Sequence, residues 1–187
     1  MAEQVNGRRR GRAWITAAWI TITALLLLTP LVAMQFTNEV NWTVSDFAFA
    51  GAVLVGAGII YEFAARAGNL AYQAAVVTAL GASVLTLWTT GAVGIIGSEA
   101  NPGNLLYLAV VALAIIGALI TGGRAAAMVG VTLLAGICTA LVPLIALAGV
   151  ANPTTDVLSP EVWIATGVLT AAWLLSARLF WVSRPKA

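Results

Sequence analysis

Long apolar stretches constrain the fold of this chain more than any other feature of its sequence. Six of them follow one another, each near the roughly 20 residues that an α-helix needs to cross a hydrocarbon core of about 30 Å. They lie at residues 13–35, 46–64, 70–96, 104–121, 125–149 and 161–182. The third is the longest, and we expect it to be tilted or to end in an irregular segment. Helices satisfy their backbone polar groups internally, as lipid requires. We therefore predict an all-α, polytopic membrane protein built as a six-transmembrane-helix bundle.

The composition excludes two other classes of protein. Of the 187 residues, 61% are hydrophobic and only 9% are charged, whereas a soluble domain has about 25% charged residues. Such a chain cannot cover a water-facing surface, and it is too apolar to be disordered. Its basic residues are few and dispersed, so we expect no nucleic-acid partner.

The residue types that are missing exclude much catalytic chemistry. The chain has no histidine and one cysteine, Cys138, so it cannot form a His-dependent triad, an intramolecular disulfide or a cysteine metal cluster. Cys138 lies within an apolar stretch, where a cysteine usually acts as a small hydrophobic residue. We predict no catalytic residues, no metal and no cofactor, and we expect the protein not to be an enzyme.

The distribution of basic residues predicts the orientation. If the N-terminus is cytoplasmic, a chain with six spans has four segments on the inner side. These are residues 1–12, the turns near 65–69 and 122–124, and the C-terminal tail. All nine basic residues fall in or beside these segments: Arg8, Arg9, Arg10, Arg12, Arg66, Arg124, Arg178, Arg184 and Lys186. The opposite connections, 36–45, 97–103 and 150–160, contain none. By the positive-inside rule, both termini are cytoplasmic.

This orientation divides the chain into a basic cytoplasmic tail at 1–12, a transmembrane domain at 13–182 and a short cytoplasmic tail at 183–187. The first span has the basic lead of a signal peptide, but its apolar run is too long and no clear cleavage site follows. We predict an uncleaved first helix and a multi-pass location in the bacterial inner membrane.

Local signals refine the helices. Thr43 to Asp46 provides caps for the second helix, and Ser159-Pro160-Glu161 has the order of an N-cap, a first-position proline and a first-turn acid. Small residues recur every four positions in the second and third helices. Such stripes allow close helix packing in lipid, so we expect these two helices to carry central contacts, unless the stripes only reflect general alanine and glycine richness.

Glu62 is the most deeply embedded acid, and Arg66 follows it at i+4 on the same helix face. This spacing suits an intramembrane ion pair near the inner boundary. The alternative function is a relay for protons or cations, because charges within spans are costly and often functional.

The segment from residue 94 to 104 combines flexible glycines with polar groups. Glu99, Asn101 and Asn104 offer oxygen ligands if this segment enters the bundle and lines a pocket. The alternative is an ordinary capped turn between two helices. Glu39 and Asp46 belong with Glu99 to an acidic outer face that either attracts cations or is simply solvated.

Several strings resemble a family of small, uncharacterised bacterial inner-membrane proteins. The resemblance covers roughly residues 25–120. It is carried by Glu39-Val40-Asn41-Trp42 with Asp46-Phe47, by Tyr61-Glu62, and by Val93 to Glu99 with Asn101-Pro102 and Asn104-Leu105. It implies a multi-helix inner-membrane protein without an assigned activity.

Three classes of function follow. The first is a non-catalytic membrane protein, such as an accessory subunit, that binds a membrane-protein partner, a lipid or a pigment. The second is a small ion or solute transporter or channel, which can be a homo-oligomer and requires a polar cavity reaching Glu62 or Glu99. The third is an intramembrane enzyme, which requires acids and hydroxyls to converge in one pocket. We favour the first class, because the loops are short and catalytic groups are scarce.

Overall fold

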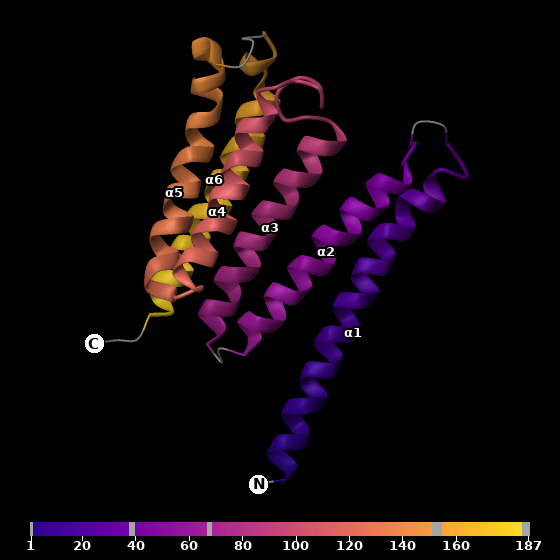
Figure 1. Ribbon diagram of the computed structural model, residues 1–187, viewed down its shortest axis with the longest axis vertical. Coiled ribbons are helices and arrows are strands. Elements are labelled where there is room, and N and C mark those ends of the chain that lie inside the picture. Colours follow the sequence, from indigo (N-terminus) through magenta and orange to yellow (C-terminus); the bar gives the residue numbers. More distant parts are fainter. Residues whose placement is uncertain (1, 38–39, 67–68, 151–154, 185–187) are drawn as a thin grey trace. The chain divides into compact units, whose positions relative to one another are not determined.

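The computed structural model describes residues 2–37, 40–66, 69–150 and 155–184, which are helical with short connections and contain no strand. The six α-helices are α1 (Ala2–Ala33), α2 (Val44–Ala65), α3 (Leu70–Ala92), α4 (Asn104–Thr121), α5 (Ala125–Ile145) and α6 (Pro160–Val182) (Figure 1). A π-helical turn, Ala146–Val150, extends α5, and a 3-10 turn, Thr155–Leu158, precedes α6. Glu39 lies outside the described residues.

Five helical segments are long and apolar enough to cross a membrane: α2, α3, α4, Ala125–Gly149 and α6. In α1, the described apolar part is the shorter Trp19–Ala33. The prediction of an all-α, polytopic membrane protein is therefore confirmed, while the sixth span stays a prediction. The N-terminal segment expected as a tail is helical from Ala2 onward.

The helices fall into two compact units, residues 1–66 and 67–187. The first unit is an antiparallel hairpin of α1 and α2 (Figure 1). Helix α2 begins with the predicted cap: the Thr43 backbone N–H donates to the Asp46 carboxylate at 2.7 Å, and the Asp46 N–H donates to the Thr43 hydroxyl. These reciprocal bonds satisfy backbone groups that a helix start leaves open.

The second unit is a closed ring of four helices in which each helix contacts two others. Helix α6 packs against α3 and α5, and α4 contacts the same two helices. The largest fully buried side chains, Trp173, Tyr107 and Phe180, fill its centre. We expected the second and third helices to carry the central contacts, but within this unit α6 has the most extensive packing. Helix α2 belongs to the other unit, and α3 does pack on α6, with its small residues Ala75 and Ala82 buried. The bulky aromatic residues of α6 fill the interior beside them.

Besides its aromatic residues, this unit buries small and hydroxyl-bearing side chains, and it exposes large aliphatic ones. Ala135, Thr132 and Ser176 are fully buried, whereas Leu119 and Ile120 are 76% and 77% exposed. Small residues inside allow close backbone approach, and large aliphatic residues outside suit contact with lipid tails. The packing therefore agrees with the polytopic class independently of helix length.

The third helix ends earlier than the apolar stretch that predicted it. It stops at Ala92 because the chain turns at Gly94, whose φ of +78° is open to glycine but costly for other residues. A Cβ on Gly94 would also lie 2.5 Å from the Ser98 backbone. Ile95 and Ile96 lie in the following loop, so the predicted third stretch ends in an irregular segment.

Candidate functional site

The loop between α3 and α4 is organised around Asn104, which is 2% exposed. Its side-chain oxygen accepts hydrogen bonds from the backbone N–H groups of Ile95 and Ile96, both at 2.9 Å. Its amide nitrogen donates to the Ser98 carbonyl at 2.8 Å. The same nitrogen also donates to the Ile96 carbonyl at 3.4 Å. Asn104 thus serves four backbone groups of a loop that has no helix or sheet to satisfy them.

The same loop is anchored by apolar packing. Ile95 and Ile96 belong to the hydrophobic core of the second unit, together with Tyr107 and Val162. Burying these two side chains draws the loop onto the end of the four-helix ring, and Asn104 makes the accompanying burial of backbone possible. These contacts match the alternative of a capped turn, and they give Asn104 a structural role.

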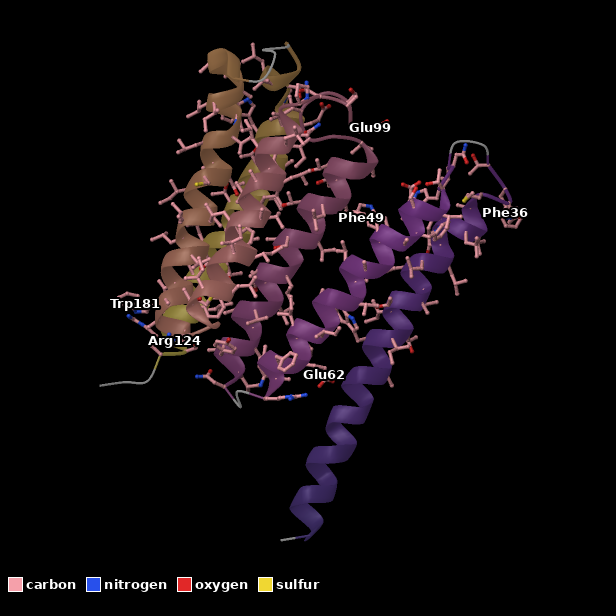
Figure 2. The ribbon with its side chains drawn as sticks, in the orientation of Figure 1. Phe36, Phe49, Glu62, Glu99, Arg124 and Trp181 are labelled. Carbon is pink, nitrogen blue, oxygen red and sulfur yellow. The ribbon has the colours of Figure 1, made fainter. Side chains whose placement is uncertain are left out.

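The predicted ligands of this loop do not converge. Glu99 is exposed at the tip of the loop (Figure 2), and the Asn101 side-chain oxygen accepts a bond from the Gly103 N–H at 2.9 Å. The Asn104 oxygen already accepts two bonds inside the core. Among the described residues, no group of three or more acids or cysteines is placed to hold a metal ion.

Asp46 lies in the first unit and serves the start of α2. Its carboxylate accepts hydrogen bonds from both the Thr43 N–H and the Thr43 hydroxyl at 2.7 Å. Glu99 belongs to the second unit, where it is exposed. The proposed cation-attracting face stays a prediction, and Glu39 lies outside the described residues.

A groove of about 600 Å³ runs between α1 and α2. We call it the α1–α2 groove. Residues from both helices line it: Trp19, Ile20, Thr23, Ala24, Leu27, Val55, Gly58, Ile59, Tyr61, Glu62, Phe63 and Arg66. Most of its wall is apolar. Its charged groups lie toward the C-terminal end of α2: Glu62 in the last turn (Figure 2) and Arg66 at the C-cap.

One wall of the groove is formed by Trp19 of α1, which is fixed against α2. Its indole N–H donates to the Leu54 carbonyl at 3.1 Å. Gly58 makes this approach possible, because a Cβ at that position would overlap the indole ring. The tryptophan thus joins the two helices at one level and leaves the groove beside it.

At the charged end, the Arg66 guanidinium lies over the Phe63 ring, with 4.8 Å between the guanidinium carbon and the ring centroid. This cation–π contact holds the charge next to the apolar wall. The predicted Glu62–Arg66 ion pair stays a prediction, but both side chains do line the same groove. An apolar trough that ends in charged groups is chemically suited to a molecule with an apolar chain and a polar head.

The sequence pointed to Glu62 and Arg66 but not to the groove. On α2, four groove residues recur at the spacing of a single helix face, and this spacing identifies one wall of the groove: Val55, Ile59, Glu62 and Arg66. The opposite wall depends on which face of α1 meets α2, and periodicity in two uniformly apolar helices does not reveal that pairing.

Comparison with models of protein families, with curated proteins and with solved structures gives no match. The resemblance to small inner-membrane proteins therefore stays a prediction.

Proposed function

We propose that this chain is a non-catalytic, multi-pass protein of the bacterial inner membrane that binds one amphipathic lipid in the α1–α2 groove. The observation that supports this proposal is the combination of an apolar trough with Glu62 and Arg66 at one end. Its volume of about 600 Å³ is within the usual range for small-molecule sites, about 300–1,000 Å³.

The apolar wall favours a lipid over an ion. A hydrated cation entering the groove would exchange water for aliphatic and aromatic side chains, and burying a charge without partners is strongly unfavourable. A lipid tail has no such cost. Transport of an ion, the second class predicted from the sequence, is therefore less well supported by the character of the groove, although the groove does reach Glu62.

The proposed orientation gives the groove a place in the bilayer. With six spans and cytoplasmic termini, Arg66 lies at the inner boundary, on the side from which α1 starts, because α1 and α2 are antiparallel. A lipid in the groove would then extend its tail toward the bilayer centre and keep its headgroup at the inner leaflet. Long basic side chains near helix ends commonly reach this level.

Filling the groove should remove the lipid. Ile59 lines the groove, and its neighbour Ile60, which is 50% exposed, does not. We expect Ile59→Trp to lower the amount of lipid retained by the purified full-length protein at least fivefold, whereas Ile60→Trp leaves it unchanged. Native mass spectrometry in a mild detergent, with extraction and quantification of retained lipid, measures this difference.

Equal lipid retention by wild-type protein and both tryptophan variants would overturn the proposed site. Co-purification of a protein in place of lipid, lost in Ile59→Trp alone, would also overturn it and assign the groove to a membrane-protein partner.

A further inference from the structure

Two opposite charges mark the end of the α1–α2 groove. Glu62 and Arg66 are four residues apart on α2, which places them about 6 Å apart along the helix axis and on one face. Both line the groove; the Glu62 side chain is half-buried and that of Arg66 is exposed. Together they give this end of the groove a positive and a negative group with no net charge.

The contact between Arg66 and Phe63 leaves the guanidinium able to bind an anion. Stacking uses the face of the guanidinium group, but its N–H donors lie in its plane and point away from the ring. A carboxylate such as Glu62 likewise has several acceptor positions. A direct bond between these two side chains is therefore compatible with each of them also contacting a ligand.

The apolar wall cannot select among lipids of the same chain length. A lipid tail is already surrounded by hydrocarbon in the bilayer, so moving it into the groove gains no hydrophobic free energy. Any preference must come from the headgroup. The charged end of the groove, not its larger apolar part, therefore decides which lipid is bound.

We propose, on the basis of the lipid-binding function above, that this end selects a phosphoethanolamine headgroup. Its phosphate would accept from Arg66, and its primary ammonium, joined to the phosphate by a short ethylene bridge, would donate to Glu62. A choline headgroup has the same charges but no N–H donor. A glycerol headgroup leaves a net negative charge beside Glu62.

The test is a competition between lipids with identical dioleoyl tails: phosphatidylethanolamine, phosphatidylcholine and phosphatidylglycerol. The purified full-length protein is offered equal amounts of the three, and the bound species are counted by native mass spectrometry. We expect the ethanolamine lipid to be enriched about two- to fivefold over each of the others, the range of an exposed charge pair.

Two variants separate the charges. In Glu62→Gln, the protein should no longer prefer the ethanolamine lipid over the glycerol lipid. The substitution removes the carboxylate that repels the anionic glycerol headgroup and that accepts from the ammonium of the ethanolamine headgroup. Arg66→Gln should reduce binding of all three lipids, since each carries a phosphate. Glu99→Gln and Arg124→Gln are matched controls in the second unit, and they should retain the wild-type ratio.

The two proposals fail in different ways. Suppose that lipid is bound and that Ile59→Trp displaces it. If the three headgroups are then bound equally, or if the glycerol lipid is preferred, the headgroup proposal is overturned but the groove remains a lipid site. A wild-type preference that survives Glu62→Gln also overturns it. If no lipid is retained, or Ile59→Trp has no effect, the lipid-binding function itself is overturned.

Discussion

Asn104 shows what a single polar side chain does in an apolar protein. It bonds to the backbone of Ile95, Ile96 and Ser98, all within ten residues of it in the chain. The alternative to these bonds is a set of buried polar groups without partners, and each such group costs about 1–3 kcal/mol. The side-chain amide of Asn104 thus satisfies backbone groups that would otherwise need a helix, and this allows the loop to be buried.

We expect Asn104→Ala to destabilise the second unit by about 3 kcal/mol or more, because several buried backbone groups lose their partner at once. Asn104→Asp should be intermediate, since a carboxylate still accepts from Ile95 and Ile96 but cannot donate to Ser98. Hydrogen exchange of the Ile95 and Ile96 amides measures the effect directly. Glu99→Gln, in the exposed part of the same loop, is the control, and equal exchange in Asn104→Ala and Glu99→Gln would contradict this account.

At the level of single residues, the sequence predicted positions better than roles. It singled out Glu99, Asn101 and Asn104 because polar residues beside apolar stretches are conspicuous. It could not distinguish a ligand from a cap, because that depends on which backbone groups lie around the side chain. For Thr43 and Asp46 the distinction was possible, since the capping box is local and its three-residue spacing defines both partners.

Among the helices, α6 holds the second unit together. Its Trp173 packs next to Gly136 of α5, and its Ser176 donates to the Ala75 carbonyl of α3 at 2.8 Å. Near its start, Thr166 bonds with Tyr107 of α4 at 2.6 Å. Hydrogen bonds between helices in lipid contribute about 0.6 kcal/mol each on average, so close packing is the larger contribution to its association with α5.

Gly136 tests this packing. A Cβ there would lie 3.2 Å from a Leu174 methyl and 3.3 Å from the Trp173 Cβ, whereas a Cβ on Gly130 of the same helix meets nothing within 4 Å. We expect Gly136→Leu to cost about 1–3 kcal/mol through overpacking. That corresponds to a fall of several degrees in the unfolding temperature, at about 2–4 °C per kcal/mol for a protein of this size.

Gly130→Leu is the matched control, and we expect it to leave the unfolding temperature in detergent nearly unchanged. An equal decrease of the unfolding temperature in the two variants would contradict the packing explanation. Glycine on α5 would then be required for its backbone conformation and not for contact with α6.

Most helices were predictable because their length is set by the membrane and their ends by local chemistry. The end that differs from the predicted stretch, at Ala92, lies where apolar residues continue beyond the helix, whereas the predicted end at residue 149 agrees with the helical segment Ala125–Gly149. Hydrophobicity alone cannot report this change, because Ile95 and Ile96 are buried in a loop as part of a core that includes Val162, which is distant in sequence. Gly94 was the available local signal.

At the scale of the whole molecule, charge is segregated within the second unit. Glu99 lies at one end of α4 and Arg124 at the other (Figure 2). In the orientation we propose, the end with Arg124 faces the cytoplasm, as the positive-inside rule requires. The number of spans determines the side of the membrane on which each connection lies. Adding or removing one span would move every later connection to the opposite side.

Cysteine labelling checks this orientation. In a Cys138→Ser background, Ala100→Cys should react with an impermeant maleimide in intact inner-membrane spheroplasts. Ala126→Cys, beside Arg124, should react only after the membrane is permeabilised. Both alanines are exposed, so accessibility to the reagent depends on the side of the membrane. Labelling of Ala126→Cys in intact spheroplasts with protection of Ala100→Cys would reverse the proposed orientation.

The bond from Ser176 to Ala75 joins residues 101 positions apart, and this separation has a consequence for biogenesis. During synthesis, α3 enters the lipid long before its neighbour α6 has been translated. Its fully buried Ala75 therefore waits without its native contact until the last helix leaves the translocon. A ribosome that stops before residue 160 would release a product whose earlier helices can insert but whose ring stays open, a form that membrane quality-control proteases are suited to recognise.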